Sequence, residues 1–229
     1  MLVVLIHGAY TSPWHWHRLV PLLEKAGCDV VVPELPCDDP EAGIERYVAT
    51  VEAALPSAPT APLVVGSSLG AVTACVFASR HPVRALVTVC GVVPSPGRAV
   101  SEDNADMTQP EFAAAIDPNL DGSTTFRPEA ARALVFHESE SGLAAEAASR
   151  LRPQAALPLT EPCPFEALPD VPRVGIVSPV DRLLRPEWLG HAVRERLGVE
   201  PDELDGDHAP MLSRPARLAK LLLAAAPGA

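Results

Sequence analysis

The pentapeptide Gly66-Ser67-Ser68-Leu69-Gly70 has the residue types and the spacing of a nucleophile turn. It follows the apolar run Leu63–Val65 and precedes a stretch of helical character, Leu69–Ser79. A G-x-S-x-G sequence between a strand and a helix makes a sharp turn that exposes the middle serine in a strained backbone conformation. The flanking glycines are needed because a side chain there would collide with neighbouring backbone. The pattern predicts Ser68 as a nucleophile, with Ser67, at an x position, as the alternative.

A serine hydroxyl needs a general base, and the histidines in the last third of the chain are the candidates. His208 lies in the turn-rich segment Asp205–Pro210, after a weak apolar stretch. His191 falls within the helical pattern Glu187–Leu197, where a surface position is the simpler interpretation. Because a base must stand in a loop at the carboxyl end of the sheet, we predict His208.

A carboxylate must orient that histidine, and it is expected between the serine and the histidine in chain order. Asp181 follows the apolar run Val174–Val177, and catalytic groups gather at the carboxyl ends of parallel strands. Asp170 precedes this run and so lies at the wrong end. Asp205 and Asp207 are too close to the histidine in sequence to reach its Nδ1, so turn formation or capping is their simpler role. We predict Asp181.

An oxyanion hole needs two backbone N–H donors. One is predicted at Leu69, directly after the nucleophile, and the other at Ala9, in the loop after the first apolar run. Gly8 allows close approach of the backbone, and we expect Gly8 and Tyr10 to contact the substrate. His7 is expected to brace this loop by hydrogen bonding rather than to act in catalysis.

Two further histidines flank a tryptophan near the start of the chain. His15 and His17 alternate around Trp16, which points them to different faces of a starting helix, and no acidic residue or cysteine is close in sequence. We expect Trp14 and Trp16 to serve packing. The sequence therefore predicts no metal site and no cofactor.

The cysteines and the first residues bear on the compartment. The chain has five cysteines, an odd number, with no C-x-x-C spacing, which favours a reduced interior over a disulfide framework; Cys75 is expected to be an inert core thiol. Leu2–Ile6 is typical of a buried strand rather than of a signal sequence. No apolar run approaches the roughly 18 residues of a membrane span. We expect a cytoplasmic protein without a membrane partner.

Composition narrows the class further. The 229 residues carry a net charge of −11, and 48% of them are hydrophobic, which is enough for a sizeable core in one domain and excludes global disorder. Only 18 lysines and arginines are present, and they are spread thinly, which argues against nucleic acid as a partner.

Short apolar runs alternate with amphipathic stretches along most of the chain. The alternation predicts an α/β fold with a mainly parallel sheet of about six strands and helices on both faces. The expected strands are Leu2–Ile6, Asp29–Val32, Leu63–Val65, Ala85–Val89, Val174–Val177 and, weakly, Val199–Leu204. Helices are expected over Leu69–Ser79, over Pro215–Ala225 and around Ile44–Leu55, where Asp39 and Pro40 are the predicted N-cap and first-turn residues.

The alternation stops between residues 92 and 172. This segment holds 11 of the 26 prolines and carries 13 acidic and 5 basic residues, so it contains −8 of the net charge. It shows helical patterns at Arg127–Phe136 and Ser141–Leu151 and no good strand. At about 80 residues it is too long for a loop. We predict an inserted, mostly helical cap over 92–172, with residues 1–91 and 173–229 forming the core.

These residues together resemble a known family. The similar stretches are His7-Gly8-Ala9-Tyr10, Trp14-His15-Trp16-His17, Leu151-Arg152-Pro153-Gln154, Pro158-Leu159-Thr160-Glu161-Pro162 and Asp207-His208-Ala209-Pro210-Met211-Leu212-Ser213. The chain resembles the α/β-hydrolase superfamily and, within it, the compact esterase and hydroxynitrile lyase group that includes plant methyl-ester esterases and bacterial relatives. The resemblance implies six parallel strands, places Ser68, Asp181 and His208 at the positions of the group's catalytic triad, and suggests a homodimer.

Departures from the group bear on the reaction. Lyase members carry a lysine directly after the catalytic histidine, where this chain has Ala209, and Gly8 matches the esterases rather than the lyases. The Thr11-Ser12-Pro13 stretch also departs from the group's usual sequence near the active-site mouth. We expect a serine hydrolase that cleaves small or medium carboxylic esters through an acyl-enzyme intermediate. The alternatives are lyase-type C–C cleavage on the same fold and a small-ligand-binding protein with little turnover.

Overall fold

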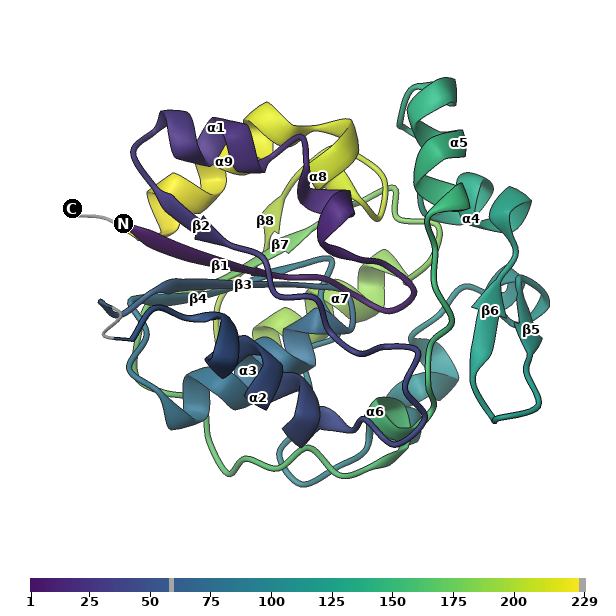
Figure 1. The fold of residues 1–229 in the computed structure, drawn as a ribbon, viewed down its shortest axis with the longest axis horizontal. Coiled ribbons are helices and arrows are strands. Elements are labelled where there is room, and N and C mark those ends of the chain that lie inside the picture. The colour runs from purple at the N-terminus through teal and green to yellow at the C-terminus, as the bar shows by residue number, and fades with distance from the viewer. Residues whose placement is uncertain (58–59, 227–229) are drawn as a thin grey trace.

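A single six-stranded sheet forms the centre of the protein, as seen in a computed structural model that describes residues 1–57 and 60–226 (Figure 1). All its pairings are parallel, in the order β2-β1-β3-β4-β7-β8. The strands are β1 (Leu2–Ile6), β2 (Asp29–Val31), β3 (Leu63–Ser67), β4 (Ala85–Val89), β7 (Arg173–Val177) and β8 (Asp202–Glu203). The predicted parallel sheet is therefore confirmed, and the weak sixth strand is reduced to two residues. Residues 58–59 and 227–229 of the predicted core lie outside the described residues.

Both faces of the sheet are covered, which explains why its central strands are apolar without interruption. Successive side chains of β1 point to opposite sides, so Val4 and Ile6 join one core cluster while Val3 and Leu5 join the other. The helices α2 (Ile44–Ala54), α3 (Gly70–Arg80) and α7 (Pro186–Ala192) cover one face; α1 (Val20–Lys25), α8 (Pro210–Ser213) and α9 (Pro215–Ala225) cover the other (Figure 1). A 3₁₀ helix (Pro13–Trp16) precedes α1, and a π-helical turn (Val193–Leu197) follows α7.

The predicted start of α2 is wrong. Asp39 accepts a hydrogen bond from the Glu41 amide in a turn, and the helix begins only at Ile44, with Gly43 as its N-cap residue. Glycine has no side chain to cap the helix, and the carboxylate of Glu161 accepts the Ile44 N–H instead. Glu161 is more than a hundred residues away in sequence, so local patterning could not reveal this cap.

The segment 92–172, hereafter the cap segment, runs largely beyond the carboxyl ends of the strands, on the right in Figure 1. Its helices are α4 (Pro128–Leu134), α5 (Ser141–Ser149) and α6 (Leu157–Thr160), with 3₁₀ helices at Val100–Asp106 and Pro110–Ala114. The expectation that it has no good strand is wrong: β5 (Ile116–Pro118) and β6 (Thr124–Phe126) form an antiparallel hairpin. Both strands are three residues long and largely polar, so they leave no apolar run to detect.

The structure bears on two expectations from the sequence, one about the cysteines and one about membrane-spanning helices. All five cysteines are buried free thiols, and Cys75 is fully buried in α3 as expected of a core residue. Among the described residues, no helix is both long and apolar enough to cross a bilayer.

Candidate active site

Ser68 stands in the turn between β3 and α3 with a left-handed backbone, φ 51°. Three main-chain hydrogen bonds hold it there: its N–H donates to the Val89 carbonyl at 3.1 Å, and its carbonyl accepts the N–H groups of Ala71 and Val92 at 3.1 and 2.9 Å. A Cβ at Gly66 would lie 2.6 Å from the backbone of residues 70 and 71, and one at Gly70 would meet the carbonyls of residues 6 and 7. The turn therefore needs both glycines and presents Ser68 at its apex, as the sequence predicts.

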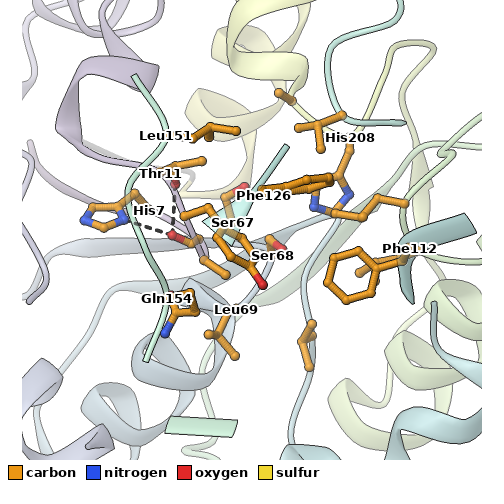
Figure 2. A pocket seen from close by; sticks show the side chains of 18 of the residues that line it. His7, Thr11, Ser67, Ser68, Leu69, Phe112, Phe126, Leu151, Gln154 and His208 are labelled. Atoms are coloured by element: carbon orange, nitrogen blue, oxygen red, sulfur yellow. Dashed lines mark hydrogen bonds between the residues drawn. The ribbon is translucent and has the colours of Figure 1, made fainter. Parts of the chain in front are cut away.

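The loop after β1 approaches this serine closely. A Cβ at Gly8 would lie 2.7 Å from Cβ of Ser68, so only glycine fits. His7 is buried and donates from Nδ1 to the Gly8 carbonyl at 3.0 Å (Figure 2). Its Nε2 accepts the Leu35 N–H at 3.0 Å. Burial lowers the pKa of His7 to about 4, so the ring is neutral near pH 7. With both nitrogens occupied, His7 braces the loop and has no free atom for catalysis, which agrees with the prediction.

The two amides predicted to form an oxyanion hole flank Ser68. Ala9 follows the braced glycine, and Leu69 follows Ser68 at the start of α3; both residues line the same cavity as Ser68. Within residues 1–57 and 60–226, neither amide has a hydrogen-bond partner. Free N–H groups beside a nucleophile, at the positive end of a buried helix, can accept a developing negative charge.

His208 and Asp181 are brought together as predicted. His208 Nδ1 lies 2.7 Å from Asp181 Oδ2, and both side chains are almost completely buried. The other oxygen, Oδ1, accepts the N–H groups of Leu183 and Leu184 at 2.8 and 2.9 Å. A carboxylate only accepts hydrogen bonds, so His208 Nδ1 is the donor in this bond.

The competing candidates lie elsewhere. His191 is exposed on α7, and Asp170 is exposed before β7. Asp205 is an exposed partner of Arg217 at 3.0 Å. Asp207 is fully buried but accepts no hydrogen bond from His208; its carboxylate holds main-chain and hydroxyl groups instead.

Ser68 and His208 face one cavity without a hydrogen bond between them. Both residues line the cavity, yet His208 Nε2 is buried and has no partner among the described residues. Catalytic hydrogen bonds are often long without substrate and tighten only in the reacting complex. The serine hydroxyl turns about a single bond, χ1, so rotation can redirect it without moving the turn.

Cys90, which follows β4, was not considered from the sequence as part of this site. Its thiol, the Asp181 carboxylate and a His208 ring nitrogen lie within 4.8 Å of one another, the one such group of three potential metal ligands in the described chain. Burial, followed by the neighbouring Asp181 charge, raises the pKa of Cys90 well above its usual range. A protonated thiol and an imidazole already bonded to the carboxylate make a poor metal site.

The cavity around Ser68 measures about 400 Å³ and is mainly apolar (Figure 2). The loops of the core supply Gly8 and Tyr10, the two residues for which substrate contact is predicted. The cap segment supplies Phe112, Phe126 and Phe136, which are not among the site residues predicted from the sequence. One signal was available: four of the five phenylalanines in this chain, which is poor in aromatic residues, fall within 92–172.

The tryptophan and histidine cluster near the start of the chain packs against the cavity and braces the cap segment. Trp16 is buried against the same cavity. His15 accepts the Ser12 N–H on Nδ1 at 3.1 Å and donates from Nε2 to the Ala147 carbonyl of α5 at 3.3 Å, which occupies both nitrogens. His17 stacks on Trp14 at the surface. His15 therefore ties the start of the chain to the cap segment.

Comparisons with known proteins agree with this geometry. The sequence profile described as "Alpha/beta hydrolase family" matches residues 3–221. The chain is 27% identical to methylesterase 17 of Arabidopsis thaliana over 97% of this chain and 90% of that protein, and 26% identical to the pyrethroid hydrolase of Sphingobium wenxiniae over 96% and 85%. The crystal structure of a pyrethroid hydrolase from Sphingobium faniae superimposes with a TM-score of 0.85 and 25% identity, covering 99% of this chain and 97% of that one.

The resemblance inferred from the residues is thereby confirmed at the level of the family. The profile spans nearly the whole chain, and the solved relative shares its fold from end to end. The serine turn, the cap segment and all of the parallel sheet except Leu2 lie within the range that the profile matches. The chain belongs to the alpha/beta hydrolase family.

Proposed function

We propose that the protein is a serine hydrolase that cleaves small or medium carboxylic esters through an acyl-enzyme intermediate. The observation that carries the proposal is the meeting of the strained Ser68 turn and the His208–Asp181 pair at one apolar cavity. The names of the relatives, a methylesterase and pyrethroid hydrolases, support ester hydrolysis as the reaction.

In the first half of the reaction, Ser68 Oγ attacks the ester carbonyl while His208 Nε2 takes its proton. Asp181 holds the imidazole by Nδ1 and stabilises the imidazolium that forms, because its carboxylate is already in place at 2.7 Å. The carbonyl oxygen becomes an oxyanion and binds the amides of Ala9 and Leu69. Each such donor is worth roughly 3 kcal/mol of transition-state stabilisation.

In the second half, the tetrahedral species collapses and His208 gives its proton to the leaving alcohol. The acyl group is then bonded to Ser68 Oγ. Water attacks this acyl-enzyme, with His208 again acting as the base, and release of the carboxylic acid restores the serine.

The cavity lining favours uncharged substrates. It includes no aspartate, glutamate, lysine or arginine among the described residues. A charged group placed there would lose its hydration without gaining a partner. We therefore propose neutral esters with an apolar acyl or alcohol part. An ethyl hexanoate substrate should exceed the monoanion of monoethyl adipate in kcat/KM by at least about 100-fold, and equal rates for the two would contradict this substrate class.

Substitution of the nucleophile provides the decisive test. Ser68→Ala should lower kcat for p-nitrophenyl butyrate by at least about 10⁴-fold while leaving the melting temperature nearly unchanged. Ser67→Ala is the matched control, since it removes a neighbouring hydroxyl that also lines the cavity and should leave turnover largely intact. The proposal is falsified if Ser68→Ala keeps its activity, or if a fluorophosphonate labels both variants equally.

The lyase alternative is disfavoured by one position. Ala209 lines the cavity directly after His208, so no ammonium group stands there to stabilise released cyanide. Turnover of mandelonitrile that disappears in Ser68→Ala would reverse this assignment.

A further inference from the structure

The carboxylate of Asp207 lies fully buried between the loop that carries His208 and the cap segment. Oδ1 accepts the Ala209 N–H at 3.1 Å and the Ser213 hydroxyl at 2.7 Å, both on the core side. Oδ2 accepts the Glu138 N–H and the Ser139 hydroxyl, each at 3.1 Å, and both of these groups belong to the α4–α5 connection of the cap segment. One carboxylate thus joins two parts of the chain that are about 70 residues apart.

A second contact lies beside the first. Arg214, at the junction of α8 and α9, forms an ion pair with Glu138 at 2.9 Å. That ion pair is partly exposed, so it contributes modestly. The Asp207 side chain is fully buried and its bonds are charge-assisted, which makes them the stronger link.

The contacts that Asp207 and Arg214 make with the cap segment are called the seam below. His208 follows Asp207 directly in the chain, so the seam constrains the backbone of His208. The Ser178 hydroxyl donates to the Gly206 carbonyl at 2.5 Å, and Asp207 itself fixes the Ala209 amide. The His208 backbone is therefore held on either side, while Asp181 holds its ring. Asp207 is the one of these residues that also forms hydrogen bonds with the cap segment.

We propose that Asp207 is a positioning residue that couples the cap segment to the catalytic base, so that the place of the α4–α5 connection sets the place of His208. The inference rests on the proposed function, in which His208 is the base. Asp207 touches no reacting atom and acts through the backbone of its neighbour. Asp207→Asn removes the charge and turns an amide N–H₂ toward one of the two backbone donors, which leaves that donor without an acceptor.

Other charged and titratable groups also surround His208 and Asp207. They are Asp181 and Cys90 in the core, Arg182 after β7, His137 and Glu138 in the cap segment, and Arg214. The variants below keep all of them. A difference in kcat between the variants can then be assigned to the contacts of the seam.

Two substitutions test the coupling: one removes the carboxylate charge of Asp207, and the other removes only its bond to the Ser139 hydroxyl. Asp207→Asn should lower kcat about 10- to 100-fold with KM changed less than about threefold, because a displaced base slows the chemistry more than binding. It should also shift the NMR signals of the His208 ring, because loss of the Asp207 bonds lets the loop that carries the ring move. Ser139→Ala removes only a cap-side bond and should lower kcat about 3- to 10-fold, again with KM nearly unchanged.

Two control variants test whether the effect depends on the hydroxyl that bonds to Asp207. Ser139→Thr keeps the hydroxyl and should restore kcat. Ser149→Ala removes a hydroxyl of the same cap segment that bonds only to Glu146 within α5, and it should leave kcat unchanged. Near-UV circular dichroism verifies that each variant keeps its packing, and Ser139→Ala decides the matter if Asp207→Asn does not fold.

The coupling would be overturned by folded Asp207→Asn and Ser139→Ala proteins whose kcat stays within twofold of the parent. The NMR signals of the His208 ring at fixed pH need no substrate and separate two kinds of failure. If the parent hydrolyses no ester while Asp207→Asn still shifts these signals, the proposed function fails and the seam stands. If activity is present but neither kcat nor the ring signals change, the seam fails alone.

Discussion

At the scale of single residues, backbone strain gathers at the site. Three residues other than glycine have a positive φ in the described chain: Tyr10 at 62°, Ser68 at 51° and Cys90 at 43°. Each follows a strand at the carboxyl edge of the sheet, and each lies beside Asp181, His208 or the cavity around Ser68. Such conformations cost of order 1–3 kcal/mol and persist only where surrounding contacts enforce them. The distribution agrees with a preorganised active site.

Tyr10 shows how one strained residue is enforced. Its carbonyl accepts the Arg152 N–H at 2.7 Å, and its hydroxyl shares a hydrogen bond of 2.7 Å with Thr124. Both partners belong to the cap segment. The ring also packs edge-on against Phe126, with centroids 5.3 Å apart. The loop that supplies the Ala9 amide is therefore held by the cap segment as well.

A double-mutant cycle can measure this bond. Tyr10→Phe keeps the ring packing and Thr124→Val keeps the volume, so together they remove little besides the hydrogen bond. The coupling in the free energy of unfolding should be about 1 kcal/mol, measured by urea denaturation. A coupling near zero would mean that the two hydroxyls gain nothing from each other beyond what water offers.

At the scale of elements, α2 depends on a carboxylate from the cap segment. Gly43 offers no cap, and Glu161 accepts the first amide of the helix, Ile44 N–H. A carboxylate at a helix N-terminus satisfies an orphan donor and interacts favourably with the helix dipole. The Pro158–Pro162 stretch, noticed first only as a resemblance, thereby gains a structural role.

Removal of this cap should be measurable. Glu161→Ala should lower the free energy of unfolding by about 1 kcal/mol, because the Ile44 N–H loses its acceptor. Glu161→Gln keeps an oxygen acceptor and should lose about half of that amount. Equal stability of all three proteins in urea would show that solvent replaces the carboxylate without cost.

Elements differ in how far the sequence predicts them. β1 and β4 coincide with their apolar runs, because strands buried on both faces are apolar throughout. The start of α2 and the β5–β6 hairpin were mispredicted, since both depend on the cap segment: one through Glu161, the other through the packing of Phe126. The positions of Ser68 and Asp181 could be predicted, because both residues follow the ends of strands. The partners of Asp207 could not, because they lie in a connection whose position no local pattern specifies.

At the scale of the whole molecule, two buried histidines govern stability in acid. Burial lowers the pKa of His7 and of His15 from 6.5 to about 4 in the folded protein. The unfolded chain therefore binds more protons than the folded one between these values. The stabilising contribution of each neutral ring is complete above pH 6.5 and is lost as the pH falls toward 4.

The expected slope is about 1.4 kcal/mol of unfolding free energy per pH unit for each histidine inside this window. Urea denaturation at several pH values between 7 and 4 measures it. His15→Gln should flatten the curve by about one histidine's share, while His191→Gln, on the exposed surface of α7, should leave the slope unchanged. Parallel curves for His15→Gln and the parent would contradict the assignment.

The turn of the β5–β6 hairpin is a suitable place for a fluorescent label. Leu120 is completely exposed there, while Gly122 and Thr124, close by in the same hairpin, line the cavity. Since all five native thiols are buried, a cysteine introduced at Leu120 would be the group that a maleimide dye reaches first. A fluorophore attached at that point would sit beside the wall of the cavity, and its emission would report substrate entry in real time without any substitution among the residues that perform the chemistry.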